Sequence, residues 1–165
     1  MLVVDAANEA DLPAVLALNQ AALPHVSALT LEALRRLHGW SGYFQVARDG
    51  GQVVGFLLTL REGCPYRSLN YQWFAERYPR FLYIDRVAIA DSHHRRGLGT
   101  RLYEDLHGFA ERRVPLVACE VNTRPANDAS LAFHERLGYR PVGSQETEGG
   151  TKSVCLMIRA VSDAG

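Results

Sequence analysis

Apolar residues in the N-terminal quarter of the chain predict one short strand followed by two helices. Leu2-Val-Val-Asp5 is typical of a short strand, and the apolar positions after it recur at helical spacing. The first helix carries Pro13 in its opening turn and ends before Pro24. Thr30 is a candidate N-cap for the second helix, which Gly39 ends.

The next segment predicts a hairpin and then a long excursion. Strands over 43–47 and 52–58 flank the turn Arg48-Asp49-Gly50-Gly51, whose residues accept positive φ angles. The aromatic-rich segment 61–80 follows, with a short helix expected over 71–77. A long excursion between two strands of a small domain is often functional. The alternative is a surface elaboration that is packed by its own aromatic side chains.

The second half of the chain alternates between strands and helices. We expect a strand over 81–90, a helix over 97–112, a strand over 115–121, a helix over 127–137 and a terminal hairpin over 139–146 and 152–159. No internal repeat or linker stands out. The pattern predicts a single mixed α/β domain over residues 1–165.

Composition and charge exclude several functional classes. Eighteen basic residues balance eighteen acidic ones, which leaves no electrostatic footprint for nucleic acid or for an anionic membrane. The longest apolar run, 53–60, is far shorter than the about 20 residues that a membrane span needs, and the N-terminus is acidic, unlike a signal peptide. Three widely spaced cysteines argue against a disulfide framework or a metal site. We therefore expect a cytoplasmic protein with no nucleic-acid or membrane partner.

A basic turn between a buried strand and an amphipathic helix carries the clearest chemistry. The first amides of a helix favour a negative charge beside them. Gly97 and Gly99 let a ligand approach the backbone, and Arg95 and Arg96 add charged donors. The turn lacks the lysine of a P-loop and the third glycine of a dinucleotide fingerprint. It predicts a site for a diphosphate; the alternative is a helix start whose glycines only ease packing.

Two separated segments resemble the signatures of the GCN5-related N-acetyltransferases. The first is Tyr83-Ile-Asp-Arg-Val-Ala-Ile-Ala90 with His94-Arg-Arg-Gly-Leu-Gly99, which is similar to the family pattern Gln/Arg-x-x-Gly-x-Gly/Ala. The second is Cys119-Glu-Val-Asn122, then Asn127 and Ser130-Leu-Ala-Phe-His-Glu-Arg-Leu-Gly-Tyr139. The resemblance implies that family's fold, an α/β (α+β) mixed sheet that is mostly antiparallel, with one parallel, splayed strand pair and flanking helices.

The resemblance also implies acetyl-CoA as the acetyl donor and places it against particular residues. The pantetheine arm would pair with backbone groups of 87–89, and the amide of Val87 would donate to the thioester carbonyl oxygen. Asn122 and Asn127 would orient the cofactor, although ordinary capping explains them equally well. The implied cofactor-binding set is Val87, Ala88, Ile89, His94, Arg95, Arg96, Gly97, Leu98, Gly99, Thr100, Asn122, Asn127, Ser130 and Phe133.

At two positions the chain departs from the family pattern. His94 stands where Gln or Arg is usual, so we expect it to contribute less to phosphate binding than Arg95 and Arg96. His134 stands where a tyrosine commonly protonates the departing CoA thiolate. An imidazole can act as a general acid near neutral pH. The alternative is a histidine that packs against the cofactor and transfers no proton.

Acetyl transfer requires a neutral amine, so a general base is expected near the strand ends. Glu120 is the first candidate, at a position where some relatives carry a catalytic glutamate, and Asp85 on the neighbouring strand is the second. A third alternative is a water-mediated base or none. Either acid could instead hold an arginine. Cys119 adjoins Glu120, but a free cysteine in a buried strand is typically part of the core.

Together these features predict an N-acetyltransferase that moves the acetyl group to a primary amine by direct attack in a ternary complex. The alternative function is a catalytically silent acyl-CoA-binding sensor or scaffold of the same fold, which the missing tyrosine favours. The aromatic excursion suits either a small-molecule amine or a peptide N-terminus as acceptor. Family habit alone suggests a homodimer.

Overall fold

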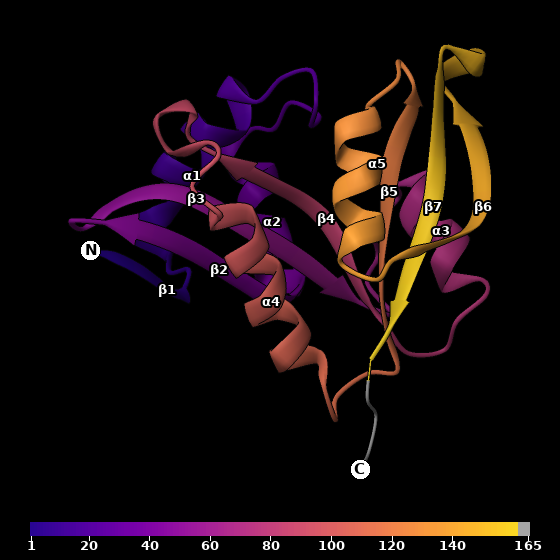
Figure 1. The fold of residues 1–165 in the computed structure, drawn as a ribbon, viewed down its shortest axis with the longest axis horizontal. Helices are drawn as coiled ribbons and strands as arrows, with labels where there is room; N and C mark the ends of the chain where they lie inside the picture. Colours follow the sequence, from indigo (N-terminus) through magenta and orange to yellow (C-terminus); the bar gives the residue numbers. More distant parts are fainter. Residues whose placement is uncertain (162–165) are drawn as a thin grey trace. The chain divides into compact units, whose positions relative to one another are not determined.

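A computed structural model describes residues 1–161 and contains one seven-stranded sheet (Figure 1). Its hydrogen-bonded order is β1-β2-β3-β4-β5-β7-β6. The strands are β1 Leu2–Ala6, β2 Ser41–Asp49, β3 Gln52–Arg61, β4 Leu82–Ile89, β5 Leu116–Arg124, β6 Arg140–Thr147 and β7 Lys152–Ala160. The β4–β5 pair is parallel, whereas β1–β2, β2–β3, β5–β7 and β6–β7 are antiparallel. The predicted mixed, mostly antiparallel sheet with one parallel pair is confirmed.

The helices lie where the apolar periodicity predicts them. They are α1 Leu12–Ala21, α2 Leu31–Trp40, α3 Leu69–Ala75, α4 Leu98–Ala110 and α5 Asp128–Arg136. Thr30 caps α2 by accepting the amide of Ala33 at 3.1 Å. The short helix in the excursion starts two residues earlier than the expected 71–77, because the Ser68 hydroxyl accepts the Tyr71 amide and caps it there. No helix among residues 1–161 is long and apolar enough to cross a membrane.

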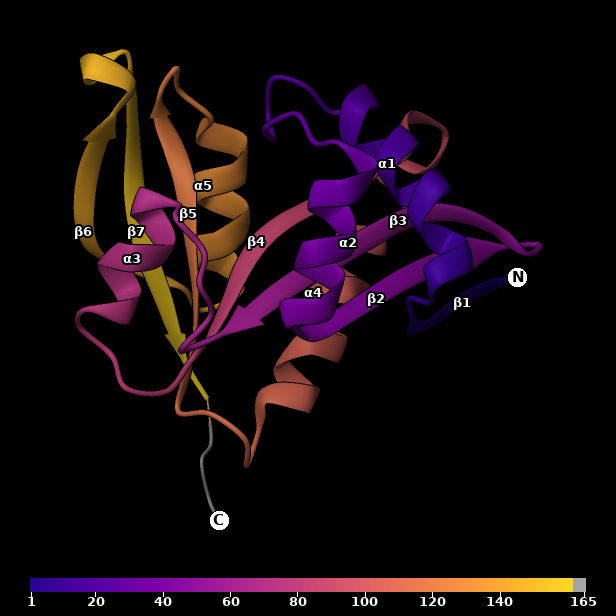
Figure 2. The same cartoon turned by 180° about the vertical axis from the view of Figure 1, so that it is seen from behind.

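Contacts within the chain form two compact units. The first unit comprises Met1–Arg61 and Ile84–Phe109. In it, α4 lies on one face of strands β2 and β3, and α1 and α2 lie on the other face (Figures 1 and 2). Its core is apolar, with Leu12, Val15, Leu34, Val46, Phe56, Leu57, Leu58, Leu102 and Leu106 fully buried.

The second unit comprises Glu62–Tyr83 and the described chain from Ala110 onward. Here α3 and α5 cover opposite faces of the strands β5, β7 and β6, with α5 in front in Figure 1 and α3 in front in Figure 2. The strand register places Glu120 opposite Leu156 and Leu156 opposite Gly143. Since side chains alternate between the faces of a strand, these three residues share one face, and Val121, Cys155 and Ser144 share the other.

Candidate active site

The Glu120 carboxylate is held by two neutral donors from different parts of the second unit. Its Oε1 atom accepts a hydrogen bond from the Tyr83 hydroxyl at 2.7 Å and another from Asn70 Nδ2 at 3.3 Å. The parallel register of β4 and β5 consists of the pairs Leu82–Val117 and Tyr83–Ala118, and Glu120 follows the second pair by two positions. A carboxylate fixed in this way can accept a proton without reorienting.

Aromatic residues of the excursion fix the Tyr83 ring. Tyr83 is buried, and its ring centroid lies 5.5 Å from that of Tyr71 and 5.9 Å from that of Phe74, both on α3. The Tyr71 ring in turn packs edge-on against Phe81 at 5.9 Å. The excursion is therefore packed by its own aromatics, as one alternative held, and it also reaches the candidate base. Neither Tyr83 nor Asn70 is among the candidate site residues that the sequence predicts.

The other face of β5 carries a cysteine that is unsuited to acyl transfer. Cys119 is buried, and burial raises the pKa of its thiol well above the usual range, with the charge of Glu120 adding to the shift. Only a thiolate is a good nucleophile, so this residue does not favour a covalent acyl-enzyme. Direct transfer to the amine remains the better prediction.

Asp85, the second candidate base, is bound to an arginine in the first unit. Its Oδ2 atom accepts a hydrogen bond from Arg86 Nε at 2.7 Å, and both side chains are 4% exposed. The Arg86 guanidinium also donates to Asn19 Oδ1 and to the Ser27 carbonyl and hydroxyl oxygens, each at 3.0 Å. This network ties β4 to the segment between α1 and α2, and it gives Asp85 a structural partner.

The Gly-rich turn has the backbone shape of an anion site. Arg95 and Gly97 both have positive φ angles, of 63° and 76°, and a Cβ added at Gly97 would meet nothing within 4 Å. The thirteen-residue helix α4 begins directly after the turn, with Leu98 buried as its anchor. Arg95, Arg96 and Gly97 are exposed. The open approach, the charges and the helix N-terminus fit a diphosphate.

His94 is engaged with the end of the preceding strand. Its Nε2 atom lies 2.8 Å from the carbonyl oxygen of Ile89, so this nitrogen donates to the backbone. Ile89 is one of the residues predicted to bind the cofactor through its backbone, along with half-buried Val87 and buried Ala88. The imidazole therefore shapes the strand end, while the exposed arginines that follow remain the stronger candidates for phosphate.

His134 is buried on α5, which lies on the other side of β5 from α3 (Figures 1 and 2). Its Nδ1 atom lies 2.7 Å from the Ser130 carbonyl oxygen and therefore carries a proton. In the neutral ring the second nitrogen then has no proton to give. Burial lowers the pKa of His134, which makes the charged form a minority near neutral pH.

The remaining predicted residues divide between the two faces. Asn122 lies on the same face of β5 as Glu120, because it is two residues further along the strand. Its register partner on β7 is Val154. Asn127 caps α5 by accepting the Ser130 amide at 3.3 Å, and the Phe133 ring packs edge-on against His134 at 5.4 Å. The structure thus brings Glu120 and Asn122 together on one face. Within residues 1–161 no cluster of side chains suits a metal ion.

The chain matches the model of a known protein family and one curated relative. The model of the acetyltransferase (GNAT) family matches residues 12–139. The curated N-alpha-acetyltransferase RimI of Mycobacterium tuberculosis is 32% identical over 110 residues, which are 66% of this chain. Those residues are 59% of RimI, so the match covers less than two thirds of that relative.

Solved structures share the fold over nearly the full chain. The ribosomal-protein-S18-alanine N-acetyltransferase of Escherichia coli has a TM-score of 0.78 and 22% identity, and the match covers 100% of this chain and 97% of that one. A ribosomal-protein-alanine N-acetyltransferase of Brucella melitensis has a TM-score of 0.70 and 23% identity, over 96% and 99% of the two chains. At such identities the likeness establishes a common fold.

Proposed function

From the premise that this chain belongs to the acetyltransferase (GNAT) family, we propose that it transfers the acetyl group of acetyl-CoA to the N-terminal amine of a protein or peptide. Acetyl-CoA is the donor that this family uses. The name of the RimI relative, an N-alpha-acetyltransferase, supports a peptide N-terminus over a small-molecule amine.

Glu120 serves as the general base in this proposal. An N-terminal ammonium must lose a proton before its nitrogen can attack the thioester carbon. The observation that carries the assignment is the 2.7 Å hydrogen bond from the Tyr83 hydroxyl to Glu120 Oε1, which holds a partly buried carboxylate on β5 in one orientation. The new C–N bond forms as the C–S bond breaks. Glu120 takes the proton that the ammonium loses, the nitrogen gives its second proton to solvent as the C–S bond breaks, and the departing thiolate takes one from solvent. Nε2 of neutral His134 carries no proton to give.

The Gly-rich turn holds the donor in the same proposal. The amides of 95–100 and the Arg95 and Arg96 side chains bind the pyrophosphate, and backbone groups of 87–89 receive the pantetheine arm. The amide of Val87 stabilises the charge that develops on the thioester oxygen. These assignments predict that donor binding and proton removal depend on different residues and can be separated by mutation.

Isothermal titration with acetyl-CoA and a free-thiol release assay with amine acceptors test this function. We expect micromolar binding, and release that is faster with peptides bearing a free N-terminus than with the same peptides after N-terminal blocking. Arg96→Glu should weaken binding at least tenfold, because it reverses a charge at the diphosphate site. Arg112→Glu makes the same charge change at an exposed position beyond the other end of α4 and should bind normally.

Each contrary outcome has a distinct meaning. Binding without turnover of any amine would favour the silent acyl-CoA-binding module over an enzyme. Faster turnover of small amines than of any peptide would overturn the assigned acceptor class. Equal binding by the Arg96→Glu and Arg112→Glu variants would overturn the assignment of the diphosphate to the Gly-rich turn.

A further inference from the structure

We propose that Asn70, on helix α3, is a positioning residue for the Glu120 carboxylate, and that Gln145 on β6 holds Asn70 in place. The proposal rests on Glu120 being the general base, as argued above. It gives the aromatic excursion a specific part in the reaction: α3 carries an amide that sets the direction in which the base points.

The strand register explains how one helix reaches both residues. Glu120, Leu156 and Gly143 form a row across β5, β7 and β6, and Asn122, Val154 and Gln145 form the next row on the same face. Helix α3 lies over this face (Figure 2). Asn70 can therefore contact β5 and β6 at once: its Nδ2 atom lies 3.3 Å from Glu120 Oε1, and its Oδ1 atom lies 2.9 Å from Gln145 Nε2.

The chemistry of the three groups fixes the direction of the hydrogen bonds from Gln145 to Asn70 and from Asn70 to Glu120. An ionised carboxylate only accepts hydrogen bonds, so Asn70 must turn its NH₂ group toward Glu120. Its carbonyl oxygen then faces Gln145 and needs a donor, which the Gln145 NH₂ group supplies. Reversing either amide would place two acceptors or two donors against each other. Gln145 therefore fixes the orientation of Asn70, and Asn70 fixes that of Glu120.

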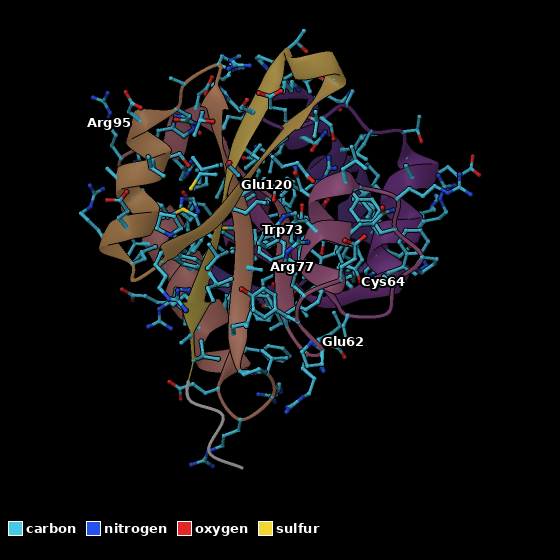
Figure 3. The ribbon with its side chains drawn as sticks, turned by 90° about the vertical axis from the view of Figure 1, so that its right-hand side faces the viewer. Glu62, Cys64, Trp73, Arg77, Arg95 and Glu120 are labelled. Atoms are coloured by element: carbon cyan, nitrogen blue, oxygen red, sulfur yellow. The ribbon has the colours of Figure 1, made fainter. Side chains whose placement is uncertain are left out.

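The helix that carries Asn70 is itself docked firmly on the same face. The Trp73 ring lies against Gly143 so closely that a Cβ added at Gly143 would come within 2.6 Å of it. The Arg77 guanidinium stacks over the Trp73 ring, 3.9 Å from its centroid. Figure 3 shows Trp73, Arg77 and Glu120 on this side of the second unit. A glycine at position 143 is thus what allows α3 to approach the sheet near Glu120.

Groups from four elements face the Glu120 carboxylate. Tyr83 from β4 donates to it, α3 presents the neutral Asn70, β6 presents the neutral Gln145, and β7 presents the apolar Leu156. Cys119, beside it on β5, is buried with a raised pKa and stays protonated. Arg77 is exposed and stacked on Trp73. A negative charge introduced at position 70 would therefore act directly on Glu120.

The test is the pH dependence of kcat/KM for Asn70→Asp. This variant keeps the size of the side chain and the acceptor for Gln145, but it replaces the donor to Glu120 by a second carboxylate. Because like charges raise a carboxyl pKa, the acidic limb of the profile should move up by about one pH unit or more. Gln72→Glu adds the same charge at a half-buried position two residues along α3 and should leave that limb in place.

A second pair of variants keeps the test decisive if Asn70→Asp fails to fold. Gln145→Met and Asn70→Leu should each lower kcat about fivefold with an unchanged KM for acetyl-CoA, and the double variant should be no worse than Asn70→Leu alone. Additive losses would show that Gln145 does not act through Asn70, and would overturn the proposal. An unshifted profile in folded Asn70→Asp would overturn the role of Asn70 while leaving the base intact. Full activity in Glu120→Gln would instead overturn the assignment of Glu120 as the base, and absence of turnover in the wild type would overturn the proposed function.

Discussion

Two carboxylates on neighbouring strands, Asp85 and Glu120, show how surroundings decide what an acid can do. Asp85 faces a guanidinium at 2.7 Å, in a network that joins β4 to α1 and to the segment after it. Glu120 faces a phenol and an amide, which donate hydrogen bonds without bringing a positive charge. A carboxylate held by neutral donors can accept a proton while its neighbours stay in place. One paired with a buried cation would leave that cation uncompensated.

We therefore propose a catalytic role for Glu120 and a structural role for Asp85. Removing the charge of Asp85 leaves a buried guanidinium without its counter-ion, which costs stability. Removing the charge of Glu120 should instead lower activity, if it is the base. Replacing each acid by its amide therefore separates the two roles, because the shape of each side chain is kept.

Glu120→Gln should have the largest effect of the changes considered. Loss of the base should lower kcat about 100-fold or more, with little change in acetyl-CoA binding, because general-base catalysis supplies a factor of this size. Thiol release under saturating acetyl-CoA and titration calorimetry measure the two quantities. A Tyr83→Phe variant should lose less, about tenfold, since it removes one hydrogen bond and keeps the carboxylate. Equal kcat in Glu120→Gln and wild type would show that Glu120 is not the base.

Asp85→Asn should act on stability instead. It leaves the buried Arg86 charge uncompensated, and we expect a loss of about 3 kcal/mol in the free energy of unfolding, measured by urea denaturation. The control is Asp5→Asn, which breaks the more exposed pair with Arg48 and should cost less than about 1 kcal/mol. Turnover per folded molecule should stay within about threefold of wild type. A 100-fold loss of turnover in folded Asp85→Asn would make Asp85 the base.

Asp85 and Glu120 also show which features of the protein can be predicted from sequence. Alternating apolar residues, the cap at Thr30 and the glycine turns predicted every strand and main helix, because these signals are local. The strand Tyr83–Ala90 and the Gly-rich turn were also predictable, since a backbone anion site is encoded in consecutive residues. Glu120 and Asp85 can both be named as candidates from sequence, and Arg86, the partner of Asp85, is its neighbour in the chain. The sequence does not show that this ion pair is tied to Asn19 and Ser27, because those contacts join distant segments. The same holds for the contacts of Tyr83 and Asn70 with Glu120.

Asn70 and Gln145 illustrate the limit most clearly. They are 75 positions apart. They meet because α3 packs against the face of the sheet on which Gln145 of β6 lies, and the glycine at position 143 permits this close approach. Nothing in the sequence near either residue indicates the other. The aromatic spacing of the excursion could suggest that α3 packs on something, but the identity of that surface depends on the strand order β5-β7-β6.

Replacing His134, a third titratable group, should have the smallest effect, which is on the pH dependence of stability. Burial lowers its pKa, so the folded state resists protonation that the unfolded chain accepts below about pH 6.5. The unfolded state then binds more protons, and stability falls with falling pH by at most about 1.4 kcal/mol per pH unit. Above the unfolded pKa this contribution is fully present. His134→Phe removes the proton site and should lose less stability than wild type on acidification.

Urea denaturation at about pH 7.5 and about pH 5.5 measures this difference, with His25→Phe as the control. His25 is exposed between α1 and α2, so its replacement is the matched control for removal of a histidine outside the core. Turnover also discriminates: a histidine that only packs predicts that His134→Phe keeps kcat within about tenfold at neutral pH. A loss near that of Glu120→Gln, restored by His134→Tyr, would show that the imidazolium protonates the thiolate despite its low pKa. Glu120 would then be half of an acid–base pair.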